Sequence, residues 1–376
     1  MYTCELAGDG GARLTNRIEI RNLYKIFGPE PQAALKRLKA GATKDSLLAE
    51  TGSVLGVDDV SLSVPKGSIS VIMGLSGSGK STLARCVNRI LEPDAGEILL
   101  DGEDITKVGI DRMREIRRHR VSMVFQNFGL LPNKNVIENV AFGLKLRGLD
   151  LRKRHEKAGA VLEVVGLSQW ASHLPSSLSG GMRQRVGLAR ALATEADVLI
   201  MDEAFSALDP LIRTEMQDEL LRLQSSLHKT VLFITHDFQE ALRLGTRIAI
   251  MSDGALIREG DPQEIVREPG SDYVAAFTRN VDRARLFDAQ SVMLEGNSEG
   301  ITLSDNGAVT GDVMSVTPQT KLIDIARDLR LPQPIAVVDE SGRFRGRIPH
   351  DALLASMAGV ADKSHANLEK RMQPDA

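Results

Sequence analysis

A glycine-rich segment at residues 74–81 carries the clearest chemistry in this chain. It reads Gly-Leu-Ser-Gly-Ser-Gly-Lys-Ser and matches the GxxxxGK[ST] pattern in full. Glycines let the backbone curl so that successive N–H groups point at one phosphate cluster, and the helix that follows adds its positive N-terminus. Lysine supplies charge to the terminal phosphates and serine a hydroxyl to Mg²⁺. The predicted phosphate-binding residues are Gly74, Ser76, Gly77, Ser78, Gly79, Lys80, Ser81 and Thr82.

Two acidic residues follow an apolar run at 198–201. Asp202 can hold Mg²⁺ through water, together with Ser81. Glu203 stands where it could accept a proton from an attacking water, which is the role of a general base. An acidic pair at a strand end is weak evidence alone, but here it complements the glycine loop.

Two further polar residues follow strand-like segments. Gln126 comes after Val121–Phe125, and His236 comes after Phe233-Ile234-Thr235. The glutamine amide can bind a metal and orient water. The imidazole of His236 can bond a terminal phosphate and hold Glu203 and water in register. Either residue alone would more often be an ordinary residue at a strand end. The functional interpretation depends on their occurring together with the glycine loop and the acidic pair.

A second anion-binding pattern lies at Leu178-Ser179-Gly180-Gly181-Met182. A serine hydroxyl, open glycine amides and the N-terminus of a helix predicted over 182–192 form such a site. Ser179 is also a good ordinary helix N-cap. We expect the site to be completed by a phosphate from a second copy of the chain.

These residues need a parallel sheet to bring them together. The apolar runs 70–73, 198–201 and 231–234 are typical of buried parallel strands that carry a site at their C-terminal ends. A helix is predicted over 81–91, and mostly helical structure over 134–190. Strand patterns at 18–23 and 57–64 flank an insertion at 29–53 with two short helices, and Asp253-Gly254 predicts a hairpin.

Bulk properties narrow the class of protein. A net charge of −3 over 376 residues gives no general attraction to nucleic acid. Cys4 and Cys86 offer neither a disulfide framework nor a metal spacing. The chain has no apolar run of membrane-spanning length and no signal-peptide pattern, so we expect other subunits to hold it at any membrane.

The motifs together resemble the nucleotide-binding subunit of ATP-binding cassette (ABC) transporters, over about residues 17–260. Residues 74–81 resemble its Walker A loop, Gln126 its Q-loop, 178–182 its signature, Asp202 its Walker B aspartate, Glu203 its catalytic glutamate and His236 its switch histidine. Ser206-Ala207-Leu208-Asp209 resembles the D-loop at the dimer seam. The resemblance implies an α/β P-loop NTPase fold with a RecA-like core, an antiparallel β subdomain and a helical subdomain. It implies an ATPase that uses ATP and Mg²⁺ as a head-to-tail homodimer.

A closer resemblance is to the ATPase subunit of quaternary-amine importers. It rests on the insertion beginning Gly28-Pro29-Glu30-Pro31, on Ile72–Ser76, and on the stretch from Met201 to Arg213. It implies uptake of glycine betaine, proline betaine, choline or carnitine for osmoprotection. The implied partners are permease subunits and, indirectly, an extracytoplasmic binding protein, with the ATPase peripheral on the cytoplasmic face of the bacterial inner membrane.

Two features fit the family less closely. Adenine is expected to stack on an aromatic ring near the end of the first strand, either Phe27 or Tyr24. The C-terminal region, 284–360, looks like one CBS motif: strand 310–314, helix 322–329, strand 335–339, a turn at Gly346 and helix 350–354. The family pattern has two motifs. We therefore expect an N-terminal tail (1–16), an ABC domain (17–280), a small α+β CBS-like domain and a loose tail (361–376).

Three rival functions are less well supported. ABC ATPases acting on nucleic acid or ribosomes usually carry two cassettes or a long coiled coil, whereas this chain has one cassette and no heptad run. The insertion and the C-terminal region favour an importer over an exporter subunit. A regulatory protein without catalysis would lack Glu203 or His236, and both are present.

Overall fold

The computed structural model describes residues 15–126, 129–304, 306–330 and 333–359. It divides into two compact units, Met1–Ile265 and Val266–Ala376, which are described separately. The first unit ends before the domain boundary expected near residue 280. The tails expected at 1–16 and 361–376 lie outside the described residues, except that Asn16 already begins a strand.

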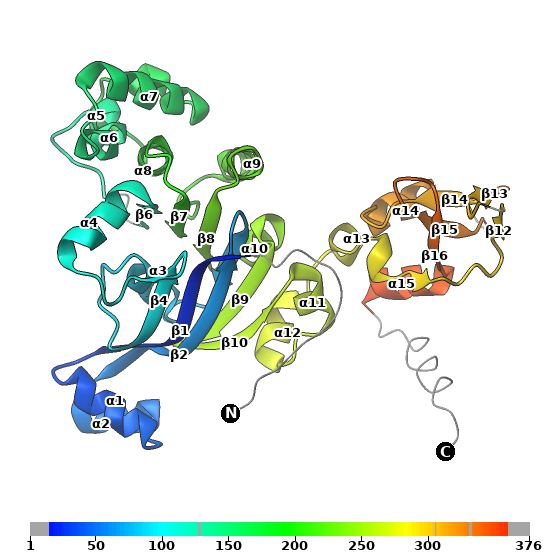
Figure 1. The fold of residues 1–376 in the computed structure, drawn as a ribbon, viewed down its shortest axis with the longest axis horizontal. Helices are drawn as coiled ribbons and strands as arrows, with labels where there is room; N and C mark the ends of the chain where they lie inside the picture. The colour runs from blue at the N-terminus through cyan, green and yellow to red at the C-terminus, as the bar shows by residue number, and fades with distance from the viewer. Residues whose placement is uncertain (1–14, 127–128, 305, 331–332, 360–376) are drawn as a thin grey trace. The chain divides into compact units, whose positions relative to one another are not determined.

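The first unit is built on a six-stranded sheet in the order β10-β9-β3-β8-β7-β6 (Figure 1). Neighbouring strands from β9 to β6 are parallel, and β10 returns antiparallel after the hairpin at Asp253-Gly254. Every residue of β3, β7 and β8 is buried, which explains their unbroken apolar runs. The strands are β3 (Ile69–Met73), β6 (Val121–Val124), β7 (Val198–Asp202), β8 (Thr230–Thr235), β9 (Arg247–Ser252) and β10 (Ala255–Gly260).

A second sheet is antiparallel, in the order β2-β1-β4-β5. Its buried side chains belong to the same hydrophobic core as those of the central sheet. Its strands are β1 (Asn16–Phe27), β2 (Val54–Pro65), β4 (Ala95–Leu100) and β5 (Glu103–Asp104). The predicted insertion lies between β1 and β2 as two helices, α1 (Pro31–Lys39) and α2 (Lys44–Thr51). Since Phe27 pairs with Val54, the insertion leaves and rejoins the sheet at one point.

Helices cover the central sheet and form a separate group at one end of the unit. The group comprises α5, α6 and α7, which pack on each other and on α8 (Figure 1). Helix α3 is shorter than predicted, because Asn88 caps it and Arg89 adopts a φ of 51°. The helices are α3 (Lys80–Val87), α4 (Ile110–His119), α5 (Val136–Val140), α6 (Phe142–Leu146), α7 (Leu151–Val164), α8 (Gly180–Ala193), α9 (Pro210–Leu227), α10 (Phe238–Leu244) and α11 (Pro262–Arg267).

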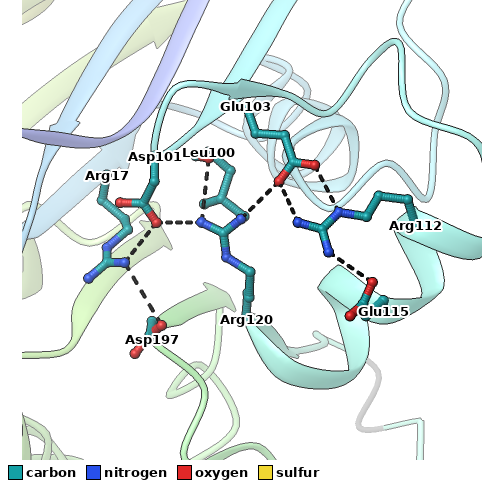
Figure 2. A network of polar contacts seen from close by, with 8 residues as sticks. All are labelled: Arg17, Leu100, Asp101, Glu103, Arg112, Glu115, Arg120 and Asp197. Atoms are coloured by element: carbon teal, nitrogen blue, oxygen red, sulfur yellow. Dashed lines mark hydrogen bonds and ion pairs between the residues drawn. The ribbon is translucent and has the colours of Figure 1, made fainter.

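Ion pairs join the two sheets through alternating charges (Figure 2). Asp101, in the β4–β5 turn, accepts from Arg17 on β1 at 2.8 Å and from Arg120, which leads into β6. Arg120 also reaches Glu103 at 3.1 Å. Glu103 in turn accepts from Nε and Nη2 of Arg112 on α4, at 2.8 and 2.9 Å. The network therefore fixes the edge of the antiparallel sheet to the strand that leads to Gln126.

The second unit contains a four-stranded sheet in the order β11-β16-β15-β14, with β14 and β15 parallel. Its elements are α12 (Asp272–Thr278), α13 (Arg283–Leu286), β11 (Leu294–Glu295), β12 (Thr302–Leu303), β13 (Val309–Thr310), β14 (Met314–Val316), α14 (Leu322–Asp328), β15 (Ile335–Val338), β16 (Phe344–Ile348) and α15 (His350–Ala358).

Two predictions in this region are wrong. The strand expected over 310–314 is two separate strands, because Gly311 takes a φ of 94° between them. Gly346, expected in a turn, lies inside β16. A side chain there would sit 2.4 Å from the Leu294 carbonyl oxygen of β11, so glycine permits the close approach of that strand.

Candidate functional site

The glycine loop lies between β3 and α3 at the C-terminal edge of the central sheet, as predicted. Gly74 adopts a φ of 153°, and a β-carbon there would lie 2.2 Å from the Met251 carbonyl oxygen. Gly79 adopts a φ of 94°, and its β-carbon would lie 2.3 Å from the Gly56 carbonyl oxygen. Both positions exclude a side chain, so the loop can keep its curled backbone only with glycine.

Lys80 is folded inside this loop. Its Nζ donates to the Leu75 carbonyl at 2.8 Å and to Ser78 Oγ at 3.3 Å, and only 4% of the residue is exposed. Burial lowers the pKa of Lys80, while the negative charges of Glu203 and Asp202 act in the opposite direction. A buried ammonium group within a curled glycine-rich loop favours an anion at this place.

Asp202 ends β7 with a fully buried side chain. Ser81 Oγ donates to Asp202 Oδ1 at 2.6 Å, but Oδ2 has no hydrogen bond, and its ion-pair partner Arg85 is 3.7 Å away. Burial raises the pKa of the Asp202 carboxyl, against the effect of the Ser81 hydrogen bond. An underused buried carboxylate oxygen beside a serine hydroxyl fits the oxygen donors that Mg²⁺ prefers.

The protein alone supplies few ligands for a cation at this point. Within the described residues, no group of three or more His, Cys, Asp or Glu side chains could hold a metal ion. Mg²⁺ commonly takes one or two protein ligands and completes its shell with substrate phosphates and water. Ser81, Asp202 and Gln126 match that sparse type of site.

Two polar side chains, which follow the strands on either side of β7, approach the Glu203 carboxylate. Gln126 Nε2 donates to Glu203 Oε2 at 3.1 Å, and His236 Nδ1 lies 3.5 Å from the same oxygen. The Glu203 side chain is 15% exposed and that of His236 is 56% exposed. The structure therefore brings together three residues that are 33 to 110 positions apart in the sequence, around a carboxylate that water can still reach.

A cavity of about 280 Å³ reaches Lys80, Ser81, Gln126 and Glu203, whereas Asp202 and His236 are outside its lining. Phe27 forms one wall with 40% of its surface exposed, and Lys25 Nζ lies 5.6 Å from its ring. Tyr24, the alternative ring, packs against the cluster formed by the insertion helices. Phe27 is therefore the ring available to a base in this cavity. The lining residues are Phe27, Val54, Leu55, Gly56, Ser76, Gly77, Gly79, Lys80, Ser81, Thr82, Gln126 and Glu203.

The segment 178–182 opens α8 and takes no part in that lining. Ser179 is exposed, and its Oγ caps the helix by accepting from the Met182 amide at 3.3 Å. Gly180 and Gly181 form the first turn. Asp209, also outside the lining, caps α9 by accepting from the Ile212 amide at 3.1 Å. Both motifs therefore form helix N-termini that do not line the cavity of their own chain.

Three further side chains support the site and were not predicted from the sequence. Arg85 is one helical turn after Ser81, so its place near Asp202 follows from helix periodicity. Gln184 is buried behind Glu203. Glu240 accepts from Thr235 Oγ1 at 2.6 Å and from Gln217 Nε2 at 3.0 Å, beneath the turn that presents His236. Burial raises the pKa of Glu240. In the sequence, Gln184 and Glu240 are visible only as polar residues that interrupt an apolar helix face, so their roles could not be predicted.

Comparison with known proteins agrees with this geometry. Residues 57–206 match the family model described as ABC transporter. The chain is 53% identical over 276 residues to the glycine betaine/proline betaine transport system ATP-binding protein ProV of Escherichia coli (strain K12), covering 73% of this chain and 69% of ProV. This chain belongs to the ABC transporter ATP-binding family.

Two more proteins extend the ABC comparison. The glycine betaine transport ATP-binding protein OpuAA of Bacillus subtilis (strain 168) is 41% identical over 389 residues, covering 91% of this chain and 93% of OpuAA. The solved dimeric structure of MJ0796, a bacterial ABC transporter cassette, superposes with a TM-score of 0.57 at 30% identity. It covers 65% of this chain and 98% of MJ0796.

The ABC assignment gives the site its activity, which is ATP hydrolysis coupled to a transporter. Among the described residues, none of the helices has both the length and the apolar character needed to cross a membrane.

Proposed function

We propose that this ATPase drives import of a quaternary-amine osmolyte, such as glycine betaine, proline betaine, choline or carnitine, through a partner permease. The similarity to the glycine betaine transport subunit OpuAA carries this proposal. The two chains are 41% identical in an alignment that covers 93% of OpuAA and therefore includes the region after the cassette. The permease and an extracytoplasmic binding protein would contact the solute, and this chain would work on the cytoplasmic face of the inner membrane.

We propose that two chains close head to tail around two ATP molecules. Lys80 and the loop amides would hold the terminal phosphates, and Phe27 would stack on the base. Ser179 and Gly181 of one chain would cover the terminal phosphate bound by the other. Support comes from the exposed Ser179, which does not line the cavity of its own chain, and from the dimeric MJ0796 cassette.

In this arrangement Glu203 accepts a proton from the attacking water. Gln126 and His236, which both approach Glu203 Oε2, would fix the carboxylate and the water between them. Mg²⁺ held by Ser81, Asp202 and Gln126 would neutralise charge on the phosphates. Loss of the terminal phosphate removes the group that joins the two chains, so the dimer opens and passes motion to the permease.

We propose that the surface after Gln126 receives a permease loop. Residues 127 and 128 lie outside the described residues, but the following segment is firmly held. Arg190 Nη1 donates to the Gly129 carbonyl at 2.6 Å, and Asn139 Oδ1 accepts from the Leu131 amide at 2.7 Å. The segment links the Gln126 strand end to α5 and α8. Charge changes there should impair transport or complex assembly.

We also propose that the second unit is a single CBS-like domain. Its support is the parallel β14–β15 pair, with β16 antiparallel beside it and helices α14 and α15 after β14 and β16. Its role would be regulatory, and removal of residues 284–376 should then change how transport responds to osmolarity while leaving ATP hydrolysis intact.

Uptake of radiolabelled solutes tests the import proposal. Cells lacking the protein would be supplied with glycine betaine, proline betaine, choline, carnitine or proline at low and high osmolarity. We expect loss of uptake of at least one quaternary amine, restored by the wild-type chain and not by Glu203→Gln. Unchanged uptake of all five would remove the substrate proposal and leave the ATPase assignment in place.

A further inference from the structure

One buried glutamine connects the helix that begins at the signature to the catalytic turn. Gln184 lies on α8 and is 1% exposed. Its Nε2 donates to the Glu203 carbonyl oxygen at 3.2 Å, and its Oε1 accepts from the Ala207 amide at 3.2 Å. Both polar ends of the side chain are therefore used on the segment that carries Glu203 and the D-loop.

The Glu203 backbone needs such support. Glu203 has a φ of 48°, in the left-handed region that side-chain-bearing residues rarely adopt. Its amide donates to the Ile234 carbonyl at 3.0 Å. Its carbonyl accepts from the Ser206 amide at 3.2 Å, from Ser206 Oγ at 2.9 Å and from Gln184. Gln184 is the donor that comes from outside the turn itself.

A buried glutamine is an unfavourable choice for packing alone. Burial of an amide side chain costs free energy unless its donors and acceptors are paired. The buried positions one turn further along the same face of α8 are Gly187 and Leu188, so an apolar residue would suit this helix face. The two hydrogen bonds from Gln184 to the strained turn that carries Glu203 explain why a glutamine lies here, which packing alone does not explain.

We infer that Gln184 is a positioning residue that couples the two nucleotide sites of the dimer. This inference rests on the proposed head-to-tail dimer. In that dimer the N-terminus of α8 contacts the nucleotide of the partner, while Glu203 acts on the nucleotide of its own chain. Gln184 ties the helix to the turn, so that engagement of Ser179 across the interface sets the backbone of Glu203 and Ala207.

Two substitutions of similar size test the coupling in the full-length protein. Gln184→Met removes both hydrogen bonds and keeps the volume, and Gln184→Glu keeps only the acceptor for Ala207. In both we expect kcat to fall by about tenfold or more, with the Kd for ATP changed by less than about twofold. We also expect the Hill coefficient of hydrolysis to fall towards one, since the sites lose their coupling.

Gln224→Met is the matched control. Gln224 Nε2 also donates to a backbone carbonyl, that of Gly67, but at the β2–β3 turn away from the cavity. It should retain wild-type kcat and Hill coefficient. Ser206→Ala, at an exposed position, removes one other donor to the Glu203 carbonyl and should lower kcat by about threefold or more without affecting folding. That variant decides the question if neither Gln184 variant folds.

Wild-type kcat and cooperativity in folded Gln184 variants would overturn the inference. The inference would also be overturned if the Gln184 variants lost activity only because they no longer bind ATP, or if Gln224→Met lost as much activity as they do. Wild-type kcat in Ser206→Ala would overturn it as well. Glu203→Gln separates this inference from the dimer proposal. If Glu203→Gln traps an ATP-bound dimer while the Gln184 variants behave as wild type, only the coupling role fails.

Discussion

At the scale of single residues, the nucleotide site depends on charges held inside the protein before any nucleotide arrives. Lys80 and Asp202 are buried on either side of Ser81, and burial shifts the pKa of each towards its neutral form. Burial of these two charged groups therefore lowers the stability of the folded protein, and bound phosphate and metal would add the opposite charges that stabilise them. This is the usual conflict between function and stability at a binding site.

Lys80→Ala should weaken ATP binding itself. The substitution removes the ammonium group at the centre of the loop while leaving the backbone amides in place. We expect the Kd for ATP to rise by about tenfold or more, because a charge-assisted hydrogen bond in a buried site contributes about 1.5–3 kcal/mol. Fluorescence titration with a labelled nucleotide measures it. Unchanged affinity in the folded variant would contradict the phosphate-binding role.

Asp202→Asn should abolish turnover but stabilise the protein without nucleotide. Because the pKa of Asp202 is raised, the folded state holds the proton more tightly than the unfolded state does. The unfolding free energy of the wild-type protein therefore falls as the pH rises from the pKa in the unfolded state to the pKa in the folded state. The amide keeps the acceptor for Ser81. We expect the unfolding free energy to increase by about 1 kcal/mol at pH 7.

Urea titrations of both proteins at several pH values check this sign. The advantage of Asp202→Asn should vanish below about pH 4, where unfolded aspartate is protonated. A constant difference across pH, or a less stable variant at pH 7, would show that the buried charge is not the cause.

At the scale of secondary-structure elements, the ends of strands determine where the chemistry lies. β3, β6, β7 and β8 are adjacent in the parallel part of the sheet, and each ends beside one functional residue or loop. The ion-pair network in Figure 2 connects the antiparallel sheet to Arg120, which immediately precedes β6. The position of Gln126 at the far end of β6 therefore depends on the joint between the two sheets.

Arg120→Met should destabilise the first unit by about 1–2 kcal/mol, because it leaves partly buried Asp101 and Glu103 with fewer partners. Trp170, the one tryptophan of the chain, lies in this unit and can report its unfolding in urea. Arg114→Met is the control. Its pair with Asp111 is largely exposed and should contribute less than about 0.5 kcal/mol. Equal effects of the two would contradict the role of the network.

Particular elements show how far sequence reasoning reached. The runs at 70–73, 198–201 and 231–234 predicted buried parallel strands correctly, because only fully buried strands lack polar alternation. Their ends then predicted the cluster of Lys80, Glu203 and His236. Gln184 could not be found in this way, since periodicity predicts which face of a helix is buried but not which backbone groups a buried amide meets.

Gly346 illustrates the opposite error. Glycine favours turns, so the sequence predicted a turn there, but the residue lies in β16, where β11 approaches closely. Such close approaches arise from tertiary packing between distant segments. The same applies to Glu240, whose partners Thr235 and Gln217 come from β8 and α9.

At the scale of the whole molecule, the proposed dimer connects the cavity of one chain with a motif that does not line that cavity in its own chain. The cavity beside Lys80 and Glu203 has no lining residue from the segment 178–182, which forms the N-terminus of α8. A second copy of the chain resolves this, because each copy would supply the half that the other lacks. In the proposed mechanism, dimerisation therefore depends on bound nucleotide.

The association state of Glu203→Gln, measured with and without MgATP, tests whether nucleotide drives the proposed dimer. Light scattering and phosphate release would be measured on the same samples, with Lys80→Ala/Glu203→Gln as the control that cannot hold ATP tightly. We predict a stable dimer only when MgATP is present, with turnover reduced by about a hundredfold or more because the general base is absent. Brisk hydrolysis, or a mass that stays the same with and without MgATP, would contradict it.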